Sequence, residues 1–216
     1  MHDPVTIFTR DNFHALCDEL AAKDPDLQQI ITQHGYPPLW NRQPNFTTLI
    51  HFILEQQVSL ASAKAALVKL QERIGSITPK KLLALSDETL KACYFSKQKI
   101  VYARCLAIAI LNKELSLNEL RHQPNDLVRT ALKKLKGIGD WTADVFLMMS
   151  LNRCDFFPTG DIALITSIKE IKHLPVKTTK EEILLIAGQW QPYRTIAAYL
   201  LWHAYLEKRK MKAAKK

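Results

Sequence analysis

The sequence lacks several features that would assign it to common protein classes. None of its apolar runs reaches the roughly 18 uninterrupted residues that a membrane helix needs, which excludes a transmembrane protein. The N-terminal stretch MHDPVTIFTRDNF has acidic and polar residues where a signal peptide has a basic start and an apolar run. We therefore expect a protein that stays inside the cell, in the cytoplasm of a bacterium or the nucleus of a eukaryote.

Cysteine is scarce and scattered. The chain has four cysteines, and no two of them form a CxxC pair. The four are Cys17, Cys93, Cys105 and Cys154. This spacing excludes a zinc ribbon and a closely spaced set of iron–sulfur ligands, and it gives no disulfide framework. We expect these residues to be small buried hydrophobes in a reducing compartment.

Acidic residues are few at one end of the chain. Residues 207–216 (EKRKMKAAKK) carry six Lys or Arg against one Glu, so they hold +5 of the formal net charge of +9. This distribution predicts a flexible basic tail that is attracted to a polyanion, with nucleic acid as the leading candidate. A terminus that only improves solubility is the alternative.

The sequence shows no alternating run of β-branched residues between turn signals, and helical spacing of apolar residues dominates. This pattern predicts a compact all-α protein with roughly ten helices. The clearest ones are expected at residues 46–57, 60–74, 99–111, 126–135, 142–151, 162–172, 179–187 and 193–206. Prolines separate these segments, and the residues beside them that are suited to helix capping include Thr78, Ser86, Asn125 and Thr178.

Glycine occurs only six times, yet two glycines fall in one tripeptide, Gly137-Ile138-Gly139, between two helical segments. Paired glycines permit positive φ and a close approach of the backbone to another group. Amides of such a turn at a helix N-terminus form a binding nest for a phosphate, and nearby lysines add positive charge. A purely structural tight turn is equally compatible with the tripeptide alone.

A second irregular stretch, FFPTGDIAL at residues 156–164, places Asp161 directly before an apolar helix. Asp161 is suited to capping that helix, a role worth about 0.5–2 kcal/mol. It is equally suited to being a carboxylate at the mouth of a cleft near the phosphate-binding turn.

Four motifs together resemble one family. LKGIGDWTADVFL followed by PTGDIAL resembles the helix–hairpin–helix motif and the aspartate-bearing loop of the helix–hairpin–helix (HhH-GPD) DNA glycosylase superfamily. ILEQQVSLASAKAALVKL resembles its helix-turn-helix, and WQPYRTIAAYLLW resembles its C-terminal helix. The matches run from about residue 45 to 205. The resemblance implies one glycosylase domain over residues 1–206, built as a two-lobed helical bundle with a cleft between lobes, followed by the tail.

The residue two positions after the second hairpin glycine decides the subclass. Family members that also cut the strand have a lysine there, whereas this chain has Trp141, which cannot form a Schiff base. The chain therefore resembles the monofunctional 3-methyladenine DNA glycosylase II branch. This implies hydrolysis of the N-glycosidic bond of alkylated purines, of the 3-methyladenine and 7-methylguanine type, in base excision repair. Two alternatives are a bifunctional glycosylase/lyase for other damaged bases and a non-enzymatic helix–hairpin–helix DNA-binding module.

The resemblance also implies roles for single residues. Asp161 is the expected catalytic carboxylate, which stabilises positive charge on the deoxyribose and orients the attacking water. Trp141 is the expected wall of the base pocket, and three further aromatics are candidates for it: Tyr36, Trp40 and Trp190. Gln57 is the expected wedge, the side chain that fills the gap left by the extruded base. The DNA-binding set is completed by Gln56, Gly137, Ile138, Gly139, Lys134 and Lys136.

The expected partner is double-stranded DNA containing damaged bases, bound by a monomer. The resemblance implies a monovalent cation at the hairpin when DNA is bound. We expect no other cofactor, no catalytic metal and no iron–sulfur cluster.

Overall fold

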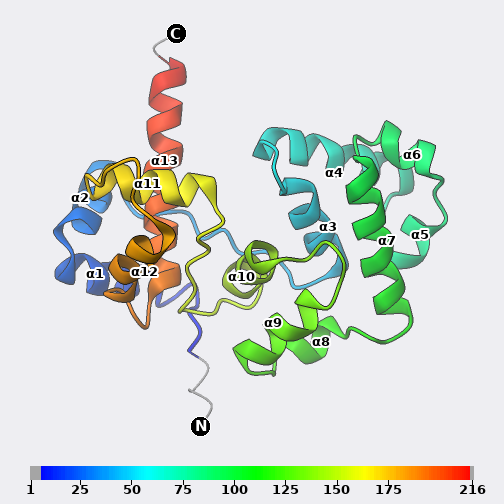
Figure 1. Cartoon of the computed structure of the whole chain (residues 1–216), viewed down its shortest axis with the longest axis horizontal. Helices are drawn as coiled ribbons and strands as arrows, with labels where there is room; N and C mark the ends of the chain where they lie inside the picture. The colour runs from blue at the N-terminus through cyan, green and yellow to red at the C-terminus, as the bar shows by residue number, and fades with distance from the viewer. Residues whose placement is uncertain (1–5, 215–216) are drawn as a thin grey trace. The chain divides into compact units, whose positions relative to one another are not determined.

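The computed structural model describes residues 6–214, so the first five residues of the N-terminal stretch lie outside the described part. Residues 6–214 form thirteen α-helices and no β-strand, apart from an isolated bridge between Ile7 and Arg153 (Figure 1). The predicted all-α fold is confirmed. In this described part, every helix is too short or too polar to cross a membrane.

The chain divides into two compact units, with one boundary after Asn41 and the other inside α10 (Asp140–Met149). Unit 1 contains the described residues up to Asn41 and from Leu147 onward, and unit 2 is Arg42–Phe146. Each unit has a core of its own. The predicted cleft stays a prediction.

Unit 1 is built around its last helix. Its helices are α1 (Phe13–Lys23), α2 (Pro25–His34), α11 (Ile162–Ile171), α12 (Lys180–Gly188) and α13 (Arg194–Ala214). Helix α13 packs against α1, α2 and α11, and ten successive residues of it, from Thr195 to Ala204, are buried. A helix that is buried on every face lies at the centre of its unit.

Unit 2 has its core along α3. Its helices are α3 (Phe46–Glu55), α4 (Leu60–Ile74), α5 (Pro79–Leu83), α6 (Asp87–Ala92), α7 (Lys97–Leu111), α8 (Leu117–Leu120), α9 (Asn125–Lys133) and the start of α10. Eight of the ten residues of α3 are buried, and α3 packs against α4 and α7. Helix α7 also packs against α5 and α6.

Two of the four predicted helix caps are confirmed. Thr78 and Ser86 accept hydrogen bonds from the amides three residues later. The other two predictions are wrong by one residue. Pro124 takes the cap position before α9, and Thr179 forms a capping box with Glu182 at the start of α12.

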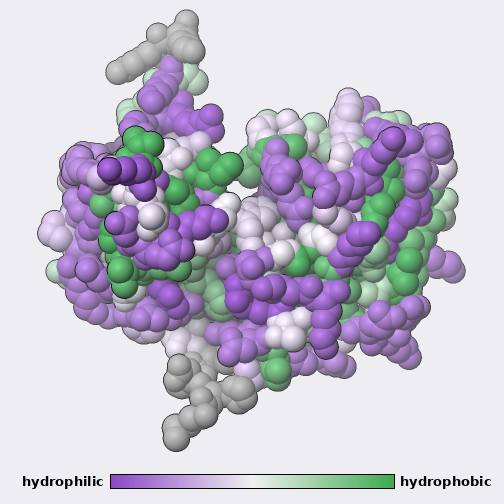
Figure 2. All heavy atoms as spheres, viewed as in Figure 1, coloured by the Kyte–Doolittle hydropathy of each residue, from purple (hydrophilic) through white to green (hydrophobic). Residues whose placement is uncertain are grey.

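The prediction of a flexible tail from residue 207 is wrong for residues 207–214, because α13 continues to Ala214. This segment consists of Glu, Lys, Arg, Met and Ala, which all favour helix, and Lys208 Nζ contacts Glu170 Oε2 at 2.7 Å. The end of α13 stands out from the rest of unit 1 (Figure 1), and Figure 2 shows it as mainly hydrophilic. Lys215 and Lys216 lie outside the described residues.

The expectation that the cysteines are buried holds for three of the four. Cys17, Cys93 and Cys154 are buried and Cys105 is half-buried, all as free thiols. Burial raises the pKa of the Cys17 and Cys154 thiols to about 12, so both stay protonated and unreactive at neutral pH.

Candidate functional site

Asp161 is the N-cap of α11 and is also bound by a tryptophan. Its Oδ1 accepts hydrogen bonds from the Leu164 amide at 2.8 Å and from Trp202 Nε1 at 3.1 Å. The residue is half-buried, and the next residue, Ile162, is 80% exposed. Two donors therefore fix the orientation of a carboxylate that still reaches the surface of unit 1. Capping the helix and presenting a carboxylate are compatible roles here.

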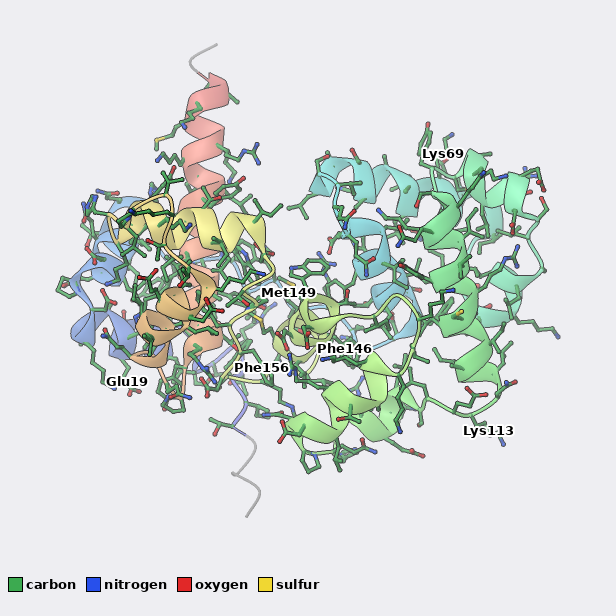
Figure 3. The ribbon with its side chains drawn as sticks, in the orientation of Figure 1. Glu19, Lys69, Lys113, Phe146, Met149 and Phe156 are labelled. Atoms are coloured by element: carbon green, nitrogen blue, oxygen red, sulfur yellow. The ribbon has the colours of Figure 1, made fainter. Side chains whose placement is uncertain are left out.

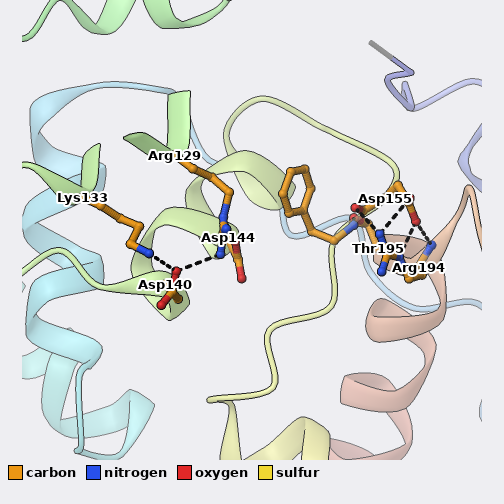
Figure 4. A network of polar contacts seen from close by, with 8 residues as sticks. Arg129, Lys133, Asp140, Asp144, Asp155, Arg194 and Thr195 are labelled. Carbon is orange, nitrogen blue, oxygen red and sulfur yellow. Dashed lines mark hydrogen bonds and ion pairs between the residues drawn. The ribbon is translucent and has the colours of Figure 1, made fainter. Parts of the chain in front are cut away.

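The loop that leads to Asp161 is held by the first residues of α13. Arg194 pairs with Asp155, with Nε at 2.6 Å from Oδ1 and Nη2 at 2.9 Å from Oδ2 (Figure 4). The Thr195 hydroxyl donates to the Arg153 carbonyl at 2.7 Å and accepts from the amide of Phe156, which Figure 3 labels. The arginine of the Trp-x-Pro-x-Arg motif and the threonine after it thus fix the loop five to eight residues before the aspartate.

An aromatic cluster adjoins Asp161. The ring of Trp202 packs against Tyr199 and Trp40, with centroid distances of 5.9 and 6.4 Å. Trp40 is half-buried and also contacts Tyr199 at 5.3 Å. The structure therefore brings Trp40, one of the predicted pocket aromatics, into the cluster that holds the aspartate.

Trp202 is a site residue that the sequence did not single out. It lies in a run of buried apolar residues of α13, where a tryptophan is typical of a protein core. Its place at the end of the WQPYRTIAAYLLW match was the available signal. Only the fold shows that its indole N–H donates to a carboxylate 41 residues away.

Two of the predicted pocket aromatics make contacts outside the aromatic cluster beside Asp161. Trp190 is 2% exposed and donates from Nε1 to Asp24 Oδ2 at 2.8 Å, so its indole binds Asp24 and its role in a base pocket stays a prediction. Tyr36 is exposed, stacks on His14 at 4.1 Å and donates its hydroxyl to Asp18 at 2.7 Å. These contacts fix Tyr36 to α1.

The two hairpin glycines have different reasons to be glycine. Gly137 has φ +92°, and a Cβ on it would lie 2.0 Å from Cγ of Tyr102. Gly139 has open space around a Cβ, and its carbonyl accepts the first hydrogen bond of α10 from Ala143. The expectation that both glycines serve the turn conformation therefore holds for Gly137 alone.

The amides of the hairpin also differ. The Ile138 amide donates to the Leu135 carbonyl at 3.1 Å and the residue is 4% exposed, so its role as a DNA contact stays a prediction. The first-turn amides of α10 follow Gly139, and a helix leaves such amides without partners in its own ladder. They carry the positive end of the helix dipole.

Cations surround this hairpin. Lys134 and Lys136 are exposed beside it. Lys133 and Arg129 converge instead on Asp140, and Arg129 also contacts the buried Asp144 at 2.7 Å (Figure 4). The hydrogen bond from Lys133 holds the pKa of Asp140 below its usual value. Burial raises the pKa of Asp144, although Arg129 opposes the shift.

The turn after α3 directs its two glutamines in opposite ways. Gln56 is half-buried, and its amide Nε2 donates to the Gly137 carbonyl at 2.8 Å and to Thr142 Oγ1 at 3.0 Å. Gln57 is exposed and has the left-handed φ of +58°. The structure therefore leaves Gln57 available to a ligand and commits the side chain of Gln56 to the hairpin.

Among residues 6–214, no group of three or more His, Cys, Asp or Glu side chains is arranged to hold a metal ion. A monovalent cation takes backbone carbonyls instead, and the carbonyl of Gly137 is already engaged by Gln56. The cation at the hairpin stays a prediction.

The model of the HhH-GPD superfamily of base excision DNA repair proteins matches residues 50–192. This range includes the hairpin, the Gln57 turn and Asp161. The chain belongs to the HhH-GPD superfamily.

Individual curated proteins also resemble the chain over more than half of its length. YfjP of Bacillus subtilis is 28% identical, over 82% of this chain and 65% of that protein. The alkylbase DNA glycosidase-like protein mag2 of Schizosaccharomyces pombe is 36% identical, over 58% of this chain and 59% of that protein. The chain thus spans about three fifths of the length of these curated relatives.

A solved structure of a DNA glycosylase has the same fold. The 3-methyladenine DNA glycosylase Mag1 of Schizosaccharomyces pombe, in complex with abasic DNA, superimposes with a TM-score of 0.80. It is 27% identical and covers 87% of this chain and 95% of its own.

Trp141, the predicted wall of the base pocket, is half-buried as the second residue of α10. An indole has no amine to attack a sugar carbon. One turn later Val145 is 2% exposed and belongs to the core.

Proposed function

We propose that this HhH-GPD protein is a monofunctional DNA glycosylase that hydrolyses the N-glycosidic bond of alkylated purines in base excision repair. The observation that carries the proposal is the Asp161 carboxylate, fixed by two donors beside an aromatic cluster. The names of the similar proteins, which specify 3-methyladenine and alkylated bases, support the substrate class. Trp141 in place of a lysine supports the monofunctional class.

The proposed reaction needs little general acid catalysis from the protein. Alkylation at N3 or N7 leaves the purine cationic, so it leaves as a neutral base when the bond from its nitrogen to C1′ breaks and the electron pair goes with the base. Positive charge then develops on the sugar. The negative charge of Asp161 stabilises it, and a water adds to C1′ and releases its proton to solvent. The product is an abasic site in an uncut strand.

The damaged base must leave the stack before this reaction. Trp141 is proposed to stack on the extruded cationic base, since an electron-rich indole face attracts a cation. Gln57 is proposed to enter the vacated position and to hydrogen-bond the orphaned partner base. The amides at the start of α10, with Lys134 and Lys136, are proposed to bind a phosphate of the double-stranded DNA.

The experiment is incubation of the protein with methylated duplex DNA, followed by chromatography of the released bases. We expect free methylated purines, strands that break only after alkali or heat, and no covalent adduct after borohydride. An efficiently trapped adduct would assign the protein to the bifunctional lyases. Tight binding to duplex DNA without base release would make it a non-enzymatic binding module.

A further inference from the structure

The turn that displays Gln57 is held more firmly than an exposed turn requires. The three residues before Gln57 each contact a different part of unit 2. The Leu54 carbonyl accepts from Lys99 Nζ at 2.6 Å, and the Glu55 carboxylate pairs with Arg42 at 2.7 and 3.1 Å. Gln56 donates both of its side-chain hydrogen bonds to the hairpin region.

Gln57 itself has an unfavourable backbone conformation. The left-handed region is unfavourable for a residue with a Cβ, because the Cβ comes too close to a backbone carbonyl oxygen. Such a conformation persists where the surroundings determine it, and it is enriched at functional sites. Here the fixed residue before it is Gln56, and α4 begins three residues later with Ser59 as its N-cap. The strain therefore lies at Gln57, the first exposed residue after the anchored segment.

Gln56, the residue before Gln57, also fixes the hairpin. The ring of Tyr102 lies against the Cα of Gly137 on one side, and the amide of Gln56 binds the Gly137 carbonyl. The second acceptor of Gln56, Thr142, is 1% exposed in the first turn of α10. A single side chain thus joins the turn of Gln57 to both ends of the segment that supplies the phosphate-binding amides.

We infer that Gln56 is a positioning residue that couples the wedge to the hairpin. Binding of a DNA phosphate at the hairpin then holds Gln57 in the position from which it enters the duplex. Extrusion of the damaged base is thereby coupled to binding of the DNA backbone. This inference rests on the proposed function and deepens it. Gln56 acts through Gln57 and touches neither the base nor the reacting atoms.

The test is a double-mutant cycle with Gln56→Met and Gln57→Ala. Methionine has nearly the shape of glutamine without its donors, and it adds no charge that would repel DNA. The readouts are single-turnover base release and the fluorescence of 2-aminopurine placed beside an abasic site. We expect Gln56→Met to lower both base release and the fluorescence gain roughly tenfold. In the Gln57→Ala background the same change should cost less than about twofold.

Two further variants complete the design. Thr142→Val removes only one acceptor, so we expect a smaller loss than for Gln56→Met. Gln71→Met places the same change on the exposed face of α4 and should leave both readouts unchanged. If Gln56→Met does not fold, the cycle is run with Thr142→Val.

The outcomes separate this inference from the proposed function. Additive effects of the two substitutions, or a Gln56→Met variant within twofold of the wild type, would overturn the coupling while wild-type base release continues. Absence of base release by the wild type would overturn the proposed function, and the fluorescence cycle would still decide the coupling.

Discussion

Unit 1 contains two aspartates with the same local contacts and different surroundings. Asp24 and Asp161 each cap a helix, and each accepts a hydrogen bond from a tryptophan indole, Trp190 and Trp202 respectively. Asp24 is 7% exposed and contacts Lys172 through both oxygens, at 2.6 and 2.8 Å. Asp161 is half-buried and adjoins the aromatic cluster of Trp202 and Trp40.

The difference shows that the cap and the indole contact do not by themselves make a reactive carboxylate. Lys172 compensates the charge of the buried, ionised Asp24 and ties it to the core of unit 1. Asp161 keeps the same two positioning contacts at a place that reaches the surface. We therefore expect substitutions of Asp24 to affect stability and substitutions of Asp161 to affect chemistry.

The largest expected effect is that of Asp161→Asn on base excision. Asparagine keeps the acceptor for the Leu164 amide and for Trp202 and caps helices as well as aspartate, so the melting temperature should change by less than about 2 °C. Removal of the charge should lower the single-turnover rate by about 10²–10³-fold. Glu170→Gln, which removes an exposed charge from the same helix, is the control. Near-normal turnover by Asp161→Asn would show that this residue is a helix cap and not the catalytic carboxylate.

The hairpin offers a second pair of like residues in unlike surroundings. Gly137→Ala should lower the free energy of unfolding by about 2–4 kcal/mol, because the new Cβ would overlap Tyr102 at a positive φ. Gly139→Ala should change it by less than about 1 kcal/mol, since space is open there. Urea unfolding of both variants measures the contrast. Equal destabilisation would show that the two glycines have the same role.

Asp24→Asn should destabilise the protein by about 1–3 kcal/mol at pH 7. Burial alone would raise the pKa of Asp24, but the hydrogen bonds from Lys172 and Trp190 lower it below the ordinary value of 3.8. A pKa that is lowered in the folded state adds stability above the unfolded-state value, and this stability is lost as the pH falls through the folded-state value. Unfolding curves of wild type and variant should therefore converge below about pH 4. A gap that does not change with pH would contradict the ion pair.

The smallest expected effect is that of removing residues 207–216. Because α13 carries exposed basic residues to Ala214, truncation after Leu206 should reduce the slope of log affinity against log salt by roughly 0.9 for each phosphate that these residues neutralise. Excision from saturated complexes should change by less than about twofold, since the segment follows the buried stretch of α13 that contributes Trp202 to the Asp161 cluster. An unchanged slope would indicate a partner other than nucleic acid.

Much of the fold and the position of Asp161 were predictable from sequence, because helical periodicity and the GIG and PTGD motifs are local signals. Most of what the sequence does not predict depends on contacts that are not local. Trp190 and Trp202 belong to the same motif, and only tertiary packing shows that one binds Asp24 and the other binds Asp161. Gly137 and Gly139 are both glycines of one tripeptide, and the difference between them is that Gly137 lies against the ring of Tyr102 on another helix. At residues 207–214 the charge pattern suggests a flexible tail, but the helix propensity of Lys, Arg and Ala prevails.

The central claim is that Asp161 is the catalytic carboxylate, and the most direct test compares it with its structural counterpart. Single-turnover release of methylated purine is measured at saturating enzyme for Asp161→Asn and Asp24→Asn, at a temperature where both variants are folded. The account predicts a loss of about 10²–10³-fold for Asp161→Asn and less than about twofold for Asp24→Asn. Equal rates for the two variants would contradict it.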